Sequence, residues 1–415
     1  MKRIYFTVTN ELLYDQRMIR ICRSLAANGY SVVLVGRRLH GSPPLREEPF
    51  EQKRLRCLFG KGRRSYLEYN LRLLIFLLFR RMDGICAIDL DTIVPCLWIS
   101  RWKRIPRIYD AHELFTEMKE VITRPRIKIV WMRVERYAVP QYSHGYTVSR
   151  SIMQEFRKRY GVNYELIRNL PVLEDSSSSP SFLPSPSLPY SSSSPSVPSS
   201  SSLPSSVPSS SSLPPSALPP LTSPYPFPYP GWQPGERFIL YQGAVNEARG
   251  LESLIGAMRQ VGCPLLICGD GPRMEACRTL AKDYGMTGKI IFRGMTDPAE
   301  LREITQKAYI GVNLVEPLGL NQYYSLANKF FDYIQAGIPQ VTMDFPEYRT
   351  AQDRYPIGLL IPDTEEKKIA EALNNLLEND VLYGMFRENC QRARLIYNWQ
   401  EEEKTLLRFY QKIFG

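Results

Sequence analysis

Short apolar runs alternate with longer amphipathic segments along most of the 415-residue chain. The first half opens with the apolar run RIYFTVT, continues with an amphipathic stretch that stops at Gly29, and returns to apolar character in YSVVLVGR. The second half repeats this rhythm from FILYQGAV onward, with amphipathic stretches at 251–261, 273–284 and 298–307. Near-continuous apolar strands that alternate with helices are typical of a parallel sheet covered on both faces. The pattern predicts two α/β domains, each with a doubly wound parallel sheet.

Polar residues directly follow several of the apolar runs. In the first half, the runs GICAID, RIYDAHE and GYTVS each end in polar side chains, and in the second half FILYQ and LLIC lead into glycine-containing loops. In open α/β sheets the ligand lies beyond the carboxyl ends of the strands. We therefore expect the ligand-binding residues at these strand ends, in a cleft between the two domains.

Residues 175–231 are almost entirely Ser and Pro, with a few scattered apolar residues. Such a composition cannot bury enough apolar surface to offset the entropy lost on ordering. We interpret the segment as a disordered linker between a first domain, 1–174, and a second, 232–395, followed by a C-terminal helix, 396–415, that packs back towards the first domain. A Pro-rich ligand for a small adaptor domain is the alternative.

Positive charge is concentrated in the first half of the chain. Residues 1–174 contain 32 Lys and Arg against 17 Asp and Glu, a net charge of +15, whereas the rest of the chain has a net charge of −4. This asymmetry indicates an anionic partner: nucleic acid, anionic lipid or a phosphate-bearing substrate. Nucleic acid is the least favoured, because no helix-turn-helix, RRM or zinc module is recognisable.

The segment 53–81 combines many of these basic residues with a strongly apolar helix core. It is either a buried helix of the first domain with solvated basic flanks, or a surface for anionic lipid and a lipid-linked acceptor. No apolar run approaches the ~18 residues of a spanning helix. The N-terminus lacks the apolar core of a signal peptide, and the eight cysteines form no C-x-x-C pair. We expect a cytoplasmic protein, with peripheral attachment to the inner face of the membrane left open.

Two loops of the second half have the composition of anion-binding loops. Arg249 follows a glycine-containing turn and directly precedes a helix, where free backbone N–H groups and a guanidinium together suit phosphate oxygens. Gly269 and Gly271, in the turn GDGP, allow a ligand to approach the backbone closely. Taken alone, each loop could equally be an ordinary turn with a solvent-facing arginine.

The stretch NKFFDYIQAG carries polar residues on a helix that is otherwise apolar. The pattern predicts a helix over 326–335 that ends at Gly337, with Asn328 and Asp332 on one face and Lys329 beside them. A lysine near a helix N-terminus can hold a diphosphate, and a carboxylate one turn later can accept hydrogen bonds from two sugar hydroxyls. The simpler alternative is a surface Lys–Asp pair.

In this order, the motifs resemble the family 4 retaining glycosyltransferases. The second half matches in YQGAVNEARGLE, ICGDGP, IIFRGMTD and NKFFDYIQAGIPQV, and the first half in TNELLYDQRMIRICRSLAANGYSVVLVGR, IDLDT, RIYDAHELFTE, YTVSRSI and YGVNYELIRNLP. The resemblance implies the GT-B fold, in which two Rossmann-like domains face each other across a cleft. It also implies an acceptor-side domain in the first half and a nucleotide-sugar donor domain in the second.

For the donor, the resemblance implies that Arg249 grips the diphosphate with the support of Lys329. Asp332 stands where the family has the second glutamate of its E-x7-E motif, which binds the ribose hydroxyls. The positions implied near the rest of the nucleotide sugar are Gly243, Gly269, Gly271, Gly294, Met295, Ser325 and Asn328.

On the acceptor side, the resemblance implies that His112, in YDAHE, touches the donor sugar, and that Asn10 faces the cleft. Without the resemblance, His112 could equally be a structural residue held by its acidic neighbours. The first acid of the E-x7-E motif is missing, since Tyr324 stands eight positions before Asp332. Either Glu316 supplies this carboxylate as a catalytic residue, or backbone groups at Asn321 and Ser325 replace it.

The resemblance implies transfer of a sugar from a nucleoside-diphosphate sugar to a glycan or lipid-linked glycan, with retention of configuration, in cell-envelope polysaccharide synthesis. It requires no cofactor and no metal: Asp89 and Asp91 have the spacing of a metal motif, but they lie in the acceptor half. The alternatives are a nucleotide-sugar epimerase of the same architecture and a non-catalytic scaffold that binds sugar nucleotides or glycans.

Overall fold

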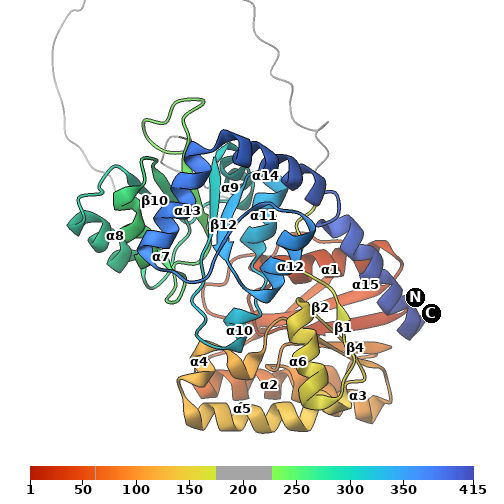
Figure 1. Ribbon diagram of the computed structural model, residues 1–415. Helices are drawn as coiled ribbons and strands as arrows, with labels where there is room; N and C mark the ends of the chain where they lie inside the picture. Colours follow the sequence, from red (N-terminus) through yellow and green to blue (C-terminus); the bar gives the residue numbers. More distant parts are fainter. Residues whose placement is uncertain (61, 174–226) are drawn as a thin grey trace, which may run out of the picture. The chain divides into compact units, whose positions relative to one another are not determined.

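A computed structural model of the chain describes residues 1–173 and 227–415, with the exception of residue 61, and these residues belong to one compact unit (Figure 1). Most of the predicted linker, 175–231, lies outside the described residues, so the linker and the domain boundaries drawn from it stay predictions. Within the described ranges, no helix is long and apolar enough to cross a bilayer.

The first half forms sheet A, which has seven strands in the order β3-β2-β1-β4-β5-β6-β7. Every neighbouring pair is parallel. The strands are β1 (Arg3–Thr7), β2 (Ser31–Arg38), β3 (Glu51–Arg56), β4 (Gly84–Ile88), β5 (Arg107–Ala111), β6 (His144–Thr147) and β7 (Glu165–Leu166).

The second half forms sheet B, which has six strands in the order β10-β9-β8-β11-β12-β13, again with every pair parallel. Its strands are β8 (Ile239–Gln242), β9 (Leu265–Cys268), β10 (Ile290–Gly294), β11 (Ile310–Asn313), β12 (Gln340–Met343) and β13 (Gly358–Ile361). In both sheets the strand order reverses at the first strand, and this switch point is where doubly wound sheets bind ligands.

Helices connect the strands of each sheet. Those of the first half are α1 (Gln16–Ala27), α2 (Gly62–Leu78), α3 (Ile93–Lys103), α4 (Lys119–Ile122), α5 (Pro125–Ala138) and α6 (Arg150–Tyr160). Those of the second half are α7 (Leu251–Ala257), α8 (Met274–Asp283), α9 (Pro298–Lys307), α10 (Leu320–Tyr323), α11 (Asn328–Ala336), α12 (Pro346–Arg354), α13 (Glu366–Glu378), α14 (Asp380–Ala393) and α15 (Trp399–Phe414).

Alternate residues of sheet A enter two separate cores, because successive side chains of a strand point to opposite faces. On β1, Tyr5 packs in the core shared with α2 and α3, whereas Ile4 and Phe6 pack in the core shared with α1 and α15. Although α15 comes last in the chain, Trp399 on this helix donates a hydrogen bond through Nε1 to Ser24 Oγ on α1, at 2.9 Å.

The predicted fold class is confirmed, since two parallel sheets with covering helices form as the apolar pattern indicated. The structure adds β3, which lies within a basic stretch that showed no apolar run. This strand pairs only with β2, at the edge of the sheet, and its side chains alternate between exposed and partly buried positions. A strand with so little burial lacks the apolar signal on which the prediction rested.

Candidate functional site

A cavity of about 600 Å³ lies beyond the carboxyl ends of the strands. Residues of both halves line it: Asn10, Asp15, Gln16, Arg17, His112, Glu113, Val148, Ile152 and Asn169 from the first, and Gln242, Gly243, Ala244, Arg249, Leu301, Asn321, Ser325, Leu326, Ala327, Asn328, Lys329 and Asp332 from the second. Hydrogen bonds also link the two halves at this cavity. Asn169 Nδ2 donates to Asn328 Oδ1 at 2.8 Å, and the Leu114 N–H donates to Asn321 Oδ1 at 2.8 Å.

Helix α11 brings Lys329 to the cavity at its first turn. The ammonium Nζ lies 3.7 Å from the centre of the Tyr241 ring, and within the described residues it forms no hydrogen bond or ion pair. Burial lowers the pKa of Lys329 well below its ordinary value, and the nearby Arg249 lowers it further. A partly buried cation beside a second cation, at a helix N-terminus, is suited to bind an anion.

Arg249 lies in the loop between β8 and α7, in an unusual stretch of backbone. The residues on either side of it, Ala248 and Gly250, both adopt the left-handed conformation, with φ of +64° and +63°. This conformation is costly for alanine, and such strain is concentrated at functional sites. In the part of the chain that the structure describes, the Arg249 guanidinium forms no hydrogen bond or ion pair and is left for a ligand.

Asp332 lies one turn further along α11. Its Oδ2 accepts a hydrogen bond from Gln242 Nε2 at 2.9 Å, and Gln242 Oε1 in turn accepts one from Thr305 Oγ1 at 2.8 Å. Burial raises the pKa of Asp332 to about 6, against the opposing effect of Arg20. The predicted alternative of a Lys329–Asp332 surface pair does not form, because Asp332 is held by Gln242 instead.

Glycines allow three strand ends of sheet B to approach one another at the cavity. The Gly243 N–H donates to Cys268 O at 2.9 Å, and the Gly269 N–H donates to Gly294 O at 2.8 Å. A Cβ atom at Gly269 would lie 1.8 Å from Gly243 O, and one at Gly243 would lie 3.4 Å from Lys329 Cε. Any side chain at Gly269 would therefore push the β8 and β9 ends apart.

Replacing Gly269 with alanine is expected to lower the free energy of unfolding by more than about 3 kcal/mol, because backbone must move to admit the methyl group. Gly285→Ala is the matched control, since Gly285 also has a positive φ, +66°, but has no atom within 4 Å of its Cβ position. That change should cost only about 1–2 kcal/mol. Denaturant unfolding measures the free energy of unfolding of both variants. Equal losses would contradict the close approach of the Gly269 and Gly243 backbones.

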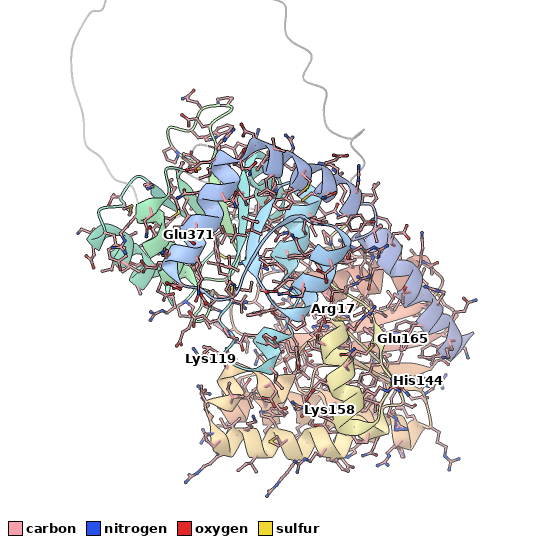
Figure 2. The ribbon with its side chains drawn as sticks, in the orientation of Figure 1. Arg17, Lys119, His144, Lys158, Glu165 and Glu371 are labelled. Atoms are coloured by element: carbon pink, nitrogen blue, oxygen red, sulfur yellow. The ribbon has the colours of Figure 1, made fainter. Side chains whose placement is uncertain are left out.

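On the acceptor side, His112 lies within a buried network at the end of β5. Its Nε2 is 3.1 Å from Asp110 Oδ2, and its Nδ1 is 3.7 Å from Asp89 Oδ2. Asp110 is 0% exposed and is also paired with Arg17 at 3.0 Å; Arg17, which is labelled in Figure 2, lies on α1. Burial alone would lower the pKa of His112, but Asp110 and Asp89 outweigh this effect and raise it to about 9. The imidazole is therefore positively charged at neutral pH.

Glu113 places a carboxylate in the same cavity. It is partly buried and, among the described residues, forms no hydrogen bond or ion pair. Burial raises the pKa of Glu113, whereas His112 and Arg249 act in the opposite direction. A carboxylate without a partner that faces two cationic groups is suited to accept a hydrogen bond from a ligand hydroxyl.

Two family models match the chain, one in each half. The model described as Glycosyltransferase Family 4 matches residues 16–171, and the model described as Glycosyl transferases group 1 matches residues 236–379. Together they cover every strand of both sheets except β1. The chain belongs to the family 4 glycosyltransferases.

One relative of this glycosyltransferase matches part of its sequence. The chain is 28% identical over 184 residues to the phosphatidyl-myo-inositol mannosyltransferase of Mycobacterium leprae, a match that covers 42% of this chain and 46% of that protein. It thus spans about half the length of that relative.

Two solved structures resemble the glycosyltransferase over nearly all of their length. Sucrose-phosphate synthase from Thermosynechococcus elongatus has a TM-score of 0.71 at 15% identity, covering 100% of this chain and 99% of that one. Anabaena HepE in complex with UDP-glucose has a TM-score of 0.66 at 10% identity, covering 99% and 100%. Such likeness shows the GT-B fold.

The cavity of the glycosyltransferase brings together most of the residues predicted for its site. Those that line it are Asn10, His112, Gly243, Arg249, Ser325, Asn328, Lys329 and Asp332. Gly269, Gly271, Gly294 and Met295 are not among the residues that line it: Gly269 and Gly294 lie in the strand ends described above, Gly271 packs against Val245 O, and Met295 is largely exposed. The ligand roles of these residues stay predictions.

Glu316, predicted as the carboxylate that replaces the missing motif acid, is not among the residues that line the cavity. Its backbone N–H donates to Ala248 O at 3.0 Å, which fixes the segment after β11 against the Arg249 loop. Sequence reasoning overlooked Glu113 as a ligand-binding group and Arg17 altogether. The adjacent residue Glu113 shares the YDAHE motif with His112, so the signal for it was present.

Proposed function

We propose that the chain transfers a sugar from a nucleoside-diphosphate sugar to a glycan or lipid-linked glycan, and that the configuration of the sugar is retained. The observation that carries this proposal is the pair of cations that line the cavity, Arg249 and Lys329, which form no hydrogen bond or ion pair within the described residues; Lys329 lies at the N-terminus of α11. The HepE structure, which holds UDP-glucose, supports a nucleotide-sugar donor.

In this proposal, Arg249, Lys329 and the first turn of α11 bind the diphosphate. The leaving nucleoside diphosphate gains charge as the bond between its phosphate oxygen and the anomeric carbon breaks. Fixed cations that face this charge stabilise the transition state without having to reorganise. The chain itself thereby supplies the electrostatic role of a metal ion, and metal independence is part of the proposal.

His112 and Glu113 are the candidates to hold the sugar. Both His112 nitrogens face carboxylates, but Nδ1 is beyond hydrogen-bond length of Asp89 and is the atom left to donate to a sugar hydroxyl. Glu113 accepts from a second hydroxyl and takes the place of the acid that Tyr324 removes from the family motif. We assign this role to Glu113 rather than to Glu316, because Glu113 lines the cavity and Glu316 does not.

Asp332 is proposed to accept hydrogen bonds from both ribose hydroxyls. Asp332→Asn keeps the size of the side chain but turns one acceptor into a donor, which leaves one hydroxyl poorly paired. We expect calorimetric titration to show a loss of affinity for nucleoside diphosphates of about 1–3 kcal/mol, but little loss for the 2′,3′-dideoxy analogues. Equal losses of affinity for both ligands would instead show that Asp332 only holds α11 in place.

The same titration has a pH signature. Because burial raises the pKa of Asp332 to about 6, nucleotide affinity should fall as the pH falls through about 6 and the carboxylate takes up a proton. The Asn variant should lack this dependence. Unfolding caused by Asp332 cannot explain this fall in affinity. Because folding raises the pKa of Asp332, its protonation makes the unliganded protein more stable as the pH falls from 6 towards 4.

A further inference from the structure

Helix α2 is apolar on two opposite sides. One side, made by Tyr69, Leu73 and Leu77, is buried against sheet A. The other side presents Leu67, which is 73% exposed, and then Leu71, Ile75 and Leu78 at helical spacing, followed by the exposed Phe79. A helix that is apolar on two opposite sides can bury one of them against its own sheet and present the other to an apolar phase or a partner. Here, the outer side has no cover within the described residues.

The two neighbouring helices continue this exposed apolar surface. On α3, Trp98 and Trp102 are one turn apart and exposed, with Trp102 65% exposed, and on α5 the exposed large apolar residues are Ile129, Val130 and Tyr137. Trp98 Nε1 donates to Tyr137 OH at 3.4 Å, which joins α3 to α5. The Lys103 ammonium donates to Leu78 O at 3.0 Å, which joins α3 to α2.

We call the exposed side of α2, α3 and α5 the outer face. All three helices cover the same side of sheet A, as their shared core shows, and Figure 1 shows them gathered below β1, β2 and β4. A contiguous exposed patch of leucine, isoleucine and tryptophan marks an interaction surface. Tryptophan is favoured where an apolar phase meets water, because its ring is apolar and its N–H is polar.

The charges of the outer face are almost all positive. The exposed basic residues of these helices and their ends are Arg63, Arg64, Arg72, Arg80, Arg81, Arg101, Arg104, Arg126, Arg133 and Arg136. The acids on the same helices are engaged. Glu68 accepts from the Leu58 and Phe59 N–H groups and pairs with Arg72 at 2.9 Å, and Glu135 is buried, where it accepts from Thr116 and Tyr160. An apolar surface surrounded by arginines that greatly outnumber the exposed acids is complementary to an anionic lipid bilayer.

We propose that the outer face docks on an anionic membrane surface, with the α2 stripe and the α3 tryptophans inserted at the level of the headgroups. Docking follows from this surface alone. Docking also implies that the acceptor belongs to the lipid-linked class, and this second step rests on the proposed function. A second copy of this chain is the rival occupant, but an arginine-rich face would then meet the arginines of its own copy, and like charges oppose that pairing.

The test is co-sedimentation of the full-length protein with vesicles of phosphatidylglycerol and phosphatidylcholine, against vesicles of phosphatidylcholine alone. We expect binding to the anionic vesicles only, weakened by salt because screening reduces the electrostatic part. Leu71→Ser combined with Ile75→Ser should reduce partitioning roughly tenfold or more, since two side chains lose apolar burial. Arg133→Gln combined with Arg126→Gln should also weaken it.

Val381→Ser is the matched control, because Val381 is 86% exposed on α14, in the second half of the chain. This variant should bind vesicles like the unchanged protein. Brominated lipid should quench the tryptophan fluorescence of the unchanged protein, and less so that of Trp102→Phe, which changes only an exposed side chain. Equal binding to neutral vesicles, unchanged binding by the Leu71/Ile75 variant, or a concentration-dependent dimer lost in that variant would each overturn the proposal. Loss of nucleotide binding with vesicle binding intact would overturn the proposed function alone.

Discussion

Arg249→Ala and Lys329→Ala are each expected to weaken binding of a nucleoside diphosphate by about 1.5–3 kcal/mol, roughly 10- to 150-fold, the range for hydrogen bonds to charged groups. The two cations line one cavity and form no ion pair among the described residues, so an anionic ligand gains both interactions on binding. Calorimetric titration with nucleoside diphosphates of different bases measures the effect.

Stability measurements separate this role from a structural one. Burial lowers the pKa of Lys329, so its charge is unfavourable in the unliganded protein, and its removal should leave the melting temperature unchanged or higher. Arg278→Ala, on the exposed surface of α8, is the matched control and should bind nucleotide normally. If both Arg249→Ala and Lys329→Ala bind nucleoside diphosphates with normal affinity, the diphosphate does not bind to these two residues in the cavity.

His112→Ala should reduce transfer by at least about 100-fold, and the pH dependence should show why. Because the pKa of His112 is raised to about 9, kcat/KM should fall as the pH rises through about 9 and the imidazolium loses its proton. His112→Ala should lose this alkaline fall. An unchanged pH profile in that variant would assign the fall to another group and leave His112 a structural residue.

Asp89→Asn tests the electrostatic network behind His112. Asp89 adopts a left-handed conformation, with φ of +51°, which asparagine also tolerates. Its Oδ1 accepts a hydrogen bond from the backbone N–H of His112 at 2.8 Å, and an amide oxygen can accept the same bond. Removing the carboxylate charge should lower the pKa of His112 and move the alkaline fall of kcat/KM to lower pH. Asp91→Asn is the control, because Asp91 bonds to Thr9 rather than to His112.

The apolar pattern was sufficient to predict the fold because most strands of both sheets are buried on both faces. Strand β1 reads as a continuous apolar run for this reason. The edge strand β3 was not predicted, since one of its sides has no neighbour and its side chains are charged. The short strand β7, with only Glu165 and Leu166, carries too little pattern to be recognised.

The sequence predicted those residues of the candidate site that lie near the carboxyl ends of strands. Arg249 lies in the loop after β8, and Lys329 and Asp332 lie near the start of α11, at the edge where the carboxyl ends of parallel strands meet their ligands. The partners of these residues could not be predicted, because they come from distant parts of the chain. Arg17 meets Asp110 across 93 residues, and Gln242 meets Asp332 across 90. Such pairs depend on the tertiary packing of α1 and β8, which leaves no local pattern.

In the proposed function, the protein transfers sugar from a nucleoside-diphosphate sugar that binds in this cavity. The most direct measurement is product analysis over a panel of nucleotide sugars, with and without a lipid extract as acceptor, for the unchanged protein and for Arg249→Ala. We expect one donor to release nucleoside diphosphate and to label the acceptor, with a large loss in the variant. Epimerisation of the donor without any acceptor, or neither release nor transfer across the whole panel, would contradict the claim.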